Sequence, residues 1–246
     1  MAKEEKSNRK FWIIGIITLI IIVGVIYYFS NYESMWSVLD NYDDRMLNCS
    51  ADLSTSMSAL DWNSASYQVT TCKNIVNEAL LKINQWYRDT PEDREVITAK
   101  LDYEATANVY DFYKILINLN KNQYSKVEIY QQQLMAIGLI DKTLQNIDTI
   151  TFSYSDTQYY NRYYRIREAD IQTYREILFN FKDQIGQRIN QTLTCPSGQV
   201  LGDDLYCYPQ CGSAKEYCKE GACCNGKCYL CPAGYSLATD CKCYSN

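Results

Sequence analysis

Histidine is absent from the 246 residues, and glycine and proline are scarce, with 10 and 4 copies. A chain without histidine lacks the commonest general base and the usual ligand of catalytic zinc, so Ser-His-Asp and Cys-His catalysis are excluded. The low glycine and proline content excludes collagen-like and long flexible tracts. A basic surplus is also missing, since the net charge is −5, and this argues against a nucleic-acid partner.

Cysteine and tyrosine are instead abundant, with 12 and 23 copies. The apolar fraction of 47% and the charged fraction of 22% are typical of an ordered protein. Glycine-rich phosphate loops, nucleophile elbows and metalloprotease helix motifs are not found. We therefore predict that the chain is not an enzyme and has no cofactor or metal site.

Residues 11–29 form one uncharged apolar run, FWIIGIITLIIIVGVIYYF. At about 1.5 Å per residue, a helix of this length crosses the hydrocarbon core of a membrane. Aromatic residues at both ends suit the two membrane interfaces. We predict a transmembrane signal-anchor helix over 11–29. A cleaved signal peptide is the alternative, but its apolar core is usually about 7–15 residues long and ends in small residues.

The charges around this run predict its orientation. Residues 1–10 carry four basic and two acidic side chains, and acidic residues come first after the run. Basic segments stay in the cytoplasm, so residues 1–10 are the predicted cytoplasmic N-terminus. The chain is then a single-pass protein of the cell membrane, with everything after residue 30 extracellular. So short a cytoplasmic part disfavours a receptor or sensor.

Residues 30–193 show the periodicity of long helices. Turn signals lie at 61–64, 89–93, 120–123 and 151–156. Between them apolar residues recur every three or four positions, in five series that run from Leu39 to Leu60, Val69 to Trp86, Ile97 to Leu119, Val127 to Ile147 and Ile171 to Ile189. This pattern is typical of amphipathic helices, and the short connections predict an antiparallel helical bundle or coiled coil. At 89–93 we expect Thr90 to be the N-cap and Pro91 the first helical residue.

Two cysteines test this layout. Cys49 and Cys72 lie on the apolar faces of consecutive predicted helices, at equal distances from the turn between them. An antiparallel hairpin brings them to one level, within reach of a disulfide. The oxidising side of the membrane favours the bridge over two buried thiols.

The other ten cysteines all lie in residues 194–246: Cys195, Cys207, Cys211, Cys218, Cys223, Cys224, Cys228, Cys231, Cys241 and Cys243. A segment of this size cannot bury enough core by itself, so we predict a separate domain held by five disulfides. Close cysteine spacings could also bind zinc or an iron–sulfur cluster, but thiols outside the cytoplasm oxidise instead.

The run C-x6-C-x4-CC-x3-C-x2-C over 211–231, with GACCNGKC at 221–228, resembles the cystine framework of knottin miniproteins. The resemblance covers only this run. It implies a binding function, because knottins are mostly binders, toxins or inhibitors. It also implies three bridges, which are Cys211–Cys224, Cys218–Cys228 and Cys223–Cys231. Four tail cysteines lie outside the pattern, so Cys223 could instead pair with Cys241 or Cys243.

Other residues mark candidate surface sites. Two Asn-x-Ser/Thr sequons make Asn48 and Asn190 candidate glycosylation sites. Tail tyrosines are candidates for a binding surface, since rigid amphipathic rings suit recognition. These are Tyr206, Tyr208, Tyr217, Tyr229 and Tyr235. We expect the tyrosines between 154 and 164 to serve helix packing, and the acidic pairs at 43–44 and 203–204 to be solvated.

Together these features predict a surface protein that presents a disulfide-locked head on a helical stalk for adhesion or recognition. Its expected partners are the membrane and a protein or glycan ligand, with self-association as a homo-oligomer also considered. The alternative is an accessory structural subunit of a larger membrane or pilus-like surface complex.

Overall fold

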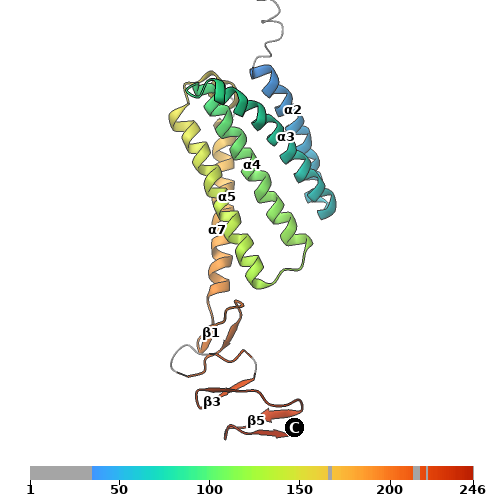
Figure 1. The fold of residues 1–246 in the computed structure, drawn as a ribbon, viewed down its shortest axis with the longest axis vertical. Coiled ribbons are helices and arrows are strands. Elements are labelled where there is room, and N and C mark those ends of the chain that lie inside the picture. Colours follow the sequence, from blue (N-terminus) through green and yellow to red (C-terminus); the bar gives the residue numbers. More distant parts are fainter. Residues whose placement is uncertain (1–34, 166–167, 213–216, 220, 246) are drawn as a thin grey trace, which may run out of the picture. The chain divides into compact units, whose positions relative to one another are not determined.

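The structure, a computed structural model, describes residues 35–165, 168–212, 217–219 and 221–245 (Figure 1). Residue contacts divide the chain into two units, 1–48 and 49–246. The predicted cytoplasmic segment 1–10 and membrane helix 11–29 lie outside the described residues. None of the helices within the described ranges is both long enough and apolar enough to span a membrane.

The described part of the chain is mainly helical. Its helices are α2 (Met35–Ser58), α3 (Trp62–Asp89), α4 (Arg94–Lys121), α5 (Lys126–Ser153), α6 (Gln158–Tyr163) and α7 (Glu168–Leu193). Five of them confirm the helices expected from periodicity. The sixth, α6, was not predicted. It is a short helix that directly follows the expected turn at 151–156 and lies before the apolar series that begins at Ile171.

One predicted helix start is wrong. Thr90 does not cap α4, because its hydroxyl donates to the carbonyl of Trp86, 3.0 Å away, and so closes the end of α3. The N-cap is Asp93, whose carboxylate accepts from the amide of Glu95 at 2.8 Å, and α4 begins at Arg94. An aspartate accepts well at this position and its charge also favours the helix N-terminus.

Consecutive helices α3 and α4 pack together, as do α4 and α5, and α5 also packs against α7. One apolar cluster joins α4, α5 and α7. Its buried members are Phe112, Ile115, Ala136, Ile140, Leu144, Ile147, Leu178, Ile185 and Ile189. Each large side chain of this kind contributes roughly 1.5–3 kcal/mol when it is fully buried, so this cluster stabilises the packing of these three helices.

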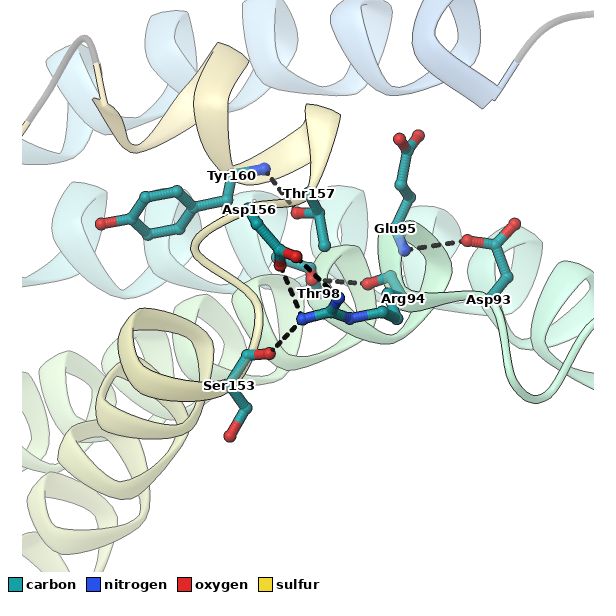
Figure 2. A network of polar contacts seen from close by, with 8 residues as sticks. All are labelled: Asp93, Arg94, Glu95, Thr98, Ser153, Asp156, Thr157 and Tyr160. Atoms are coloured by element: carbon teal, nitrogen blue, oxygen red, sulfur yellow. Dashed lines mark hydrogen bonds and ion pairs between the residues drawn. The ribbon is translucent and has the colours of Figure 1, made fainter.

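Arg94, the first residue of α4, makes hydrogen bonds to the end of α5 and to the turn that follows it (Figure 2). The guanidinium of Arg94 donates to the carboxylate of Asp156 at 2.8 Å and to the carbonyl of Ser153 at 2.7 Å. Both charged side chains are at least half exposed, so water screens their attraction. The contact therefore sets the position of the turn more than it stabilises the fold.

The predicted bridge between Cys49 and Cys72 is confirmed, with a Cα–Cα distance of 5.6 Å. Both cysteines are buried. Next to the bridge, the hydroxyls of Ser50 and Tyr110 share a hydrogen bond of 2.7 Å. The bridge ties α2 to α3, so the register of this hairpin is the one that the sequence predicts.

The tyrosines around α6 serve packing, as expected. Tyr159, Tyr160 and Tyr164 are buried. The hydroxyls of Tyr159 and Tyr164 both donate to the carboxylate of Asp102 in α4, the first at 2.7 Å. Tyr160 and Tyr164 stack with parallel rings 5.5 Å apart. A single carboxylate thus satisfies two hydroxyls in the contact between α4 and α6.

The described residues after α7 form three two-stranded antiparallel sheets. Their strands are β1 (Gln199–Leu201) with β2 (Cys207–Pro209), β3 (Ala222–Cys224) with β4 (Lys227–Tyr229), and β5 (Tyr235–Leu237) with β6 (Cys243–Ser245). Sheets this small are marginal in water, so the tail needs covalent support.

Candidate functional site: the disulfide-rich tail

The tail consists of three hairpins built on one plan. We name residues 195–209 hairpin 1, residues 218–229 hairpin 2 and residues 231–245 hairpin 3. In each, a cysteine is followed by a glycine three positions later and by the first strand four positions later. A disulfide closes each hairpin on itself: Cys195–Cys207, Cys218–Cys228 and Cys231–Cys243.

Hairpins 1 and 3 share the pattern C-P-x-G-x2-L-x2-D-x2-C-Y. The shared residues make the same contacts. The hydroxyl of Tyr208 donates to Asp204 at 2.7 Å in hairpin 1, and the hydroxyl of Tyr244 donates to Asp240 at 2.7 Å in hairpin 3. These two hairpins are therefore internal repeats. The repeat is present in the sequence, but the cysteine spacings on which the predictions were based do not reveal it.

Hairpin 2 is a shorter version of the same unit. Its two-residue turn, Asn225-Gly226, has positive φ at both positions (50° and 74°), which is the backbone of a tight hairpin turn. Gly221 has a φ of 89°, and a Cβ there would lie 2.0 Å from the carbonyl oxygen of Tyr229. Only glycine fits at that point of hairpin 2.

Two further disulfides link hairpin 2 to its neighbours. Cys223 and Cys224 are consecutive in β3, and consecutive side chains of a strand point to opposite faces. Cys223 pairs backward with Cys211, and Cys224 pairs forward with Cys241. Strand β3 is thus bonded both to the segment between hairpins 1 and 2 and to hairpin 3.

The pairing implied by the knottin resemblance is only partly right. Cys218–Cys228 is confirmed. The wrong bridges are Cys211–Cys224 and Cys223–Cys231. The physical reason is that Cys231 is the first residue of hairpin 3 and pairs with Cys243 of the same hairpin. The two adjacent cysteines of β3 therefore each form a disulfide with a different neighbouring segment. The alternative of Cys223 with Cys241 or Cys243 is also wrong, because Cys224 takes Cys241 and Cys231 takes Cys243.

All twelve cysteines are in disulfides. The sulfurs of Cys211, Cys218 and Cys228 lie within 4.8 Å of one another, a spacing that would suit a metal ion if they were thiolates. In this structure the three sulfurs belong to two neighbouring disulfides, so none of them offers a thiolate. The cluster is the place where the disulfides Cys211–Cys223 and Cys218–Cys228 lie next to each other.

Two of the tyrosines predicted for binding hold the tail together. Tyr208 and Tyr217 stack with their ring centres 5.2 Å apart and their planes 16° from parallel. The hydrogen bond from Tyr208 and a contact of 2.9 Å from the ammonium of Lys219 lower the pKa of Asp204 to about 2. The amide of Asp203 donates to the hydroxyl of Tyr217 at 3.1 Å.

Other tail aromatics are partly exposed, and the ammonium of Lys126 lies 3.9 Å from the centre of the Tyr206 ring. Tyr206 and Tyr235 are 48% and 47% exposed, as a binding surface requires, while Tyr229 is half-buried. The predicted set of binding tyrosines did not include Tyr244, whose side chain is 52% exposed. The repeat pattern would have found it, because Tyr244 matches Tyr208.

The two candidate glycosylation sites lie in helices, Asn48 in α2 and Asn190 in α7, and both side chains are exposed. Their modification stays a prediction.

A groove on the helices is a second candidate site. Asp111 and Lys114 of α4 and Met135 and Lys142 of α5 line a surface groove between these helices. Its carboxylate, Asp111, is paired with Lys73 of α3. Because Asp111 is already held in an ion pair, we take the tail as the stronger candidate.

No family model, no curated protein and no solved structure matches this chain.

Proposed function

We propose that this chain is a non-enzymatic surface protein that binds another protein or a glycan through its tail. In this proposal the helix over 11–29 anchors it in the cell membrane, with residues 1–10 in the cytoplasm and the helices and tail outside. The observation that carries it is the pairing of all twelve cysteines, five pairs of them in the tail. Such a framework persists only in an oxidising compartment.

The tail also has the chemistry of a recognition surface. Its backbone is held by bridges, so little conformational freedom is lost on binding. The rings of Tyr206 and Tyr235 are each about half exposed on this fixed frame. Aromatic side chains on a rigid scaffold supply contact area at low entropic cost.

The compartment is tested with a membrane-impermeant maleimide on intact cells. A tail outside the cell reacts strongly after a brief treatment with an impermeant reductant and weakly before it. Strong labelling only after lysis contradicts the proposal.

Binding is tested with the full chain in nanodiscs, against a glycan array and against intact cells. The double variant Tyr206→Ala/Tyr235→Ala is expected to lose most binding. The control is Leu81→Ala, which removes an equally prominent side chain from α3 that is 68% exposed. A chain that binds equally well with either change does not use its tail.

Exposed apolar side chains on the helices favour a second candidate, an accessory subunit of a larger membrane complex. Leu81, Met135 and Phe152 are 68%, 57% and 81% exposed. Extraction in mild detergent distinguishes the two. Co-purification of other chains at fixed stoichiometry, lost with Leu81→Ala or Phe152→Ala, supports the subunit.

A further inference from the structure

In hairpin 1, Tyr208 and Asp204 form a hydrogen-bonded pair, and residues 217–219 of the same chain pack against this pair. The ring of Tyr217 stacks on Tyr208 with a centre-to-centre distance of 5.2 Å. Two residues later the ammonium of Lys219 lies 2.9 Å from the carboxylate of Asp204. The segment 217–219 thus places an aromatic ring and a cation, with one residue between them, on a tyrosine and an aspartate of hairpin 1.

The backbone supports this docking. Tyr217 pairs with Gln210 in an isolated antiparallel bridge just after β2. The hydroxyl of Tyr217 accepts from the amide of Asp203 at 3.1 Å. The docked segment is therefore held by main-chain pairing at Tyr217, ring stacking and an ion pair acting together.

Hairpin 3 has the equivalent hydrogen-bonded pair, Tyr244 and Asp240. The hydroxyl of Tyr244 donates to Oδ2 of Asp240 at 2.7 Å, as Tyr208 does to Asp204. Over the stretches 35–165, 168–212, 217–219 and 221–245, no ring stacks on Tyr244 and no lysine or arginine pairs with Asp240. Tyr244 is 52% exposed, whereas Tyr208 is half-buried.

The open pair is already arranged for a ligand. The hydrogen bond to Asp240 fixes the ring of Tyr244, so stacking costs little further order. The other oxygen of Asp240 accepts from the amide of Lys242 at 3.1 Å. A carboxylate accepts about four hydrogen bonds, so it keeps room for an ammonium, as Asp204 does for Lys219.

We infer that hairpin 3 binds a segment of another protein in which an aromatic residue stands two positions before a lysine or arginine. Tyr244 stacks on the aromatic ring, and Asp240 pairs with the cation. The segment 217–219 on hairpin 1 is the template for this binding mode. The inference rests on the proposed function of the tail and specifies its site and the chemistry of its partner.

The test uses the full chain in detergent micelles and a dye-labelled peptide, Gly-Gly-Tyr-Ser-Lys-Gly-Gly, with binding followed by fluorescence anisotropy. A second peptide carries glutamine in place of lysine. The chain variants are Tyr244→Ala and Asp240→Asn. The matched control is Tyr67→Ala, which removes an exposed tyrosine of α3, outside the tail. Asp240→Asn keeps one oxygen that accepts from Tyr244, removes the charge, and replaces the oxygen that accepts from the amide of Lys242 with an NH2 group.

The lysine peptide is expected to bind saturably, and each variant to weaken it about fivefold. Asp240→Asn leaves the affinity for the glutamine peptide unchanged, since that peptide has no cation, while Tyr244→Ala weakens both. Tyr67→Ala changes neither. Native disulfide pairing in each variant, checked by non-reducing mass mapping, shows that a loss of binding is not a loss of fold.

Three results overturn the inference: no saturable binding up to the solubility of the peptide, equal affinity for the two peptides, or equal binding by wild type and Tyr244→Ala. Self-association of the chain that Tyr244→Ala abolishes, without peptide binding, overturns it as well. If the peptide fails while the chain still binds cells or glycans through Tyr206 and Tyr235, only this inference falls and the proposed function stands.

Discussion

Removing the bridge between α2 and α3 is expected to destabilise the helices by a predictable amount. The disulfide closes a loop with a sequence separation of 23 residues. In the chain-entropy model a loop of this length stabilises the folded state by about 3 kcal/mol. Both cysteines are buried, and Cys72 is fully so. Alanine is the right replacement, because serine would bury an unpaired hydroxyl. The perturbation is therefore Cys49→Ala/Cys72→Ala.

The assay is thermal unfolding of the full chain in detergent, followed by circular dichroism at 222 nm, which reports the helices. For a domain of this size, each kcal/mol shifts Tm by about 2–4 °C, so the double variant is expected to unfold about 6–12 °C lower. The control is Cys231→Ala/Cys243→Ala, which opens hairpin 3 and alters no helical residue. Its helical transition is expected to move by less than about 2 °C, since that bridge constrains only a local loop of the tail.

A Tm loss below about 2 °C in the first variant would refute the reasoning, because the loop-closure entropy would then not act on the helices. An equal loss in both variants would refute it too, since the effect would not be specific to the α2–α3 bridge. Free thiols at Cys49 and Cys72 in the wild-type chain would remove its premise.

Three further outcomes are expected. Asp102→Ala leaves two tyrosine hydroxyls without their acceptor, so the free energy of unfolding in urea should fall by about 2–4 kcal/mol, and Asp102→Asn, which keeps one acceptor oxygen, should cost less; equal losses would contradict the role of the hydrogen bonds. The pKa of Asp204, about 2 in the folded chain, lies below its ordinary value of 3.8, so the stability that it contributes is present above about pH 4 and is lost as the pH falls toward 2. Tyr208→Phe removes the largest cause of this shift and should raise the pKa in a carboxyl NMR titration, and an unchanged titration would exclude the hydrogen bond as the cause. Gly221→Ala should prevent correct closure of hairpin 2 in disulfide mapping, whereas Gly198→Ala, where a Cβ meets open space, should pair natively at a strain of about 1–2 kcal/mol.

The helical part of the fold was predictable because its apolar faces repeat over many turns. A series such as Ile97 to Leu119 leaves little freedom in the phase of α4, and the position of Cys49 and Cys72 then fixes the register of a hairpin. The helix ends were less predictable. Thr90 and Asp93 are both good caps, and only the structure shows that Thr90 finishes α3 while Asp93 starts α4.

The tail was less predictable, for a different reason. Ten cysteines allow many pairings, and spacing alone does not decide between the neighbours Cys223 and Cys224. The opposite directions of consecutive side chains in β3 decide it, and that requires knowing that β3 is a strand. The repeat of C-P-x-G-x2-L-x2-D-x2-C-Y is visible in the sequence, and with it the pairing inside hairpins 1 and 3. That residues 217–219 pack on the Tyr208–Asp204 pair, while Tyr244 of the equivalent pair in hairpin 3 is exposed, could be learned only from the structure.

The closure of each hairpin by its own bridge also bears on how such a tail could grow over evolutionary time. A unit that ties off its own ends can be duplicated in a gene without disturbing the units already present, because no shared core has to be repacked. What a new copy must add is one cysteine that faces its neighbour, as Cys224 does toward Cys241. Length and number of docking positions can then increase one hairpin at a time, while the helical part stays as it is.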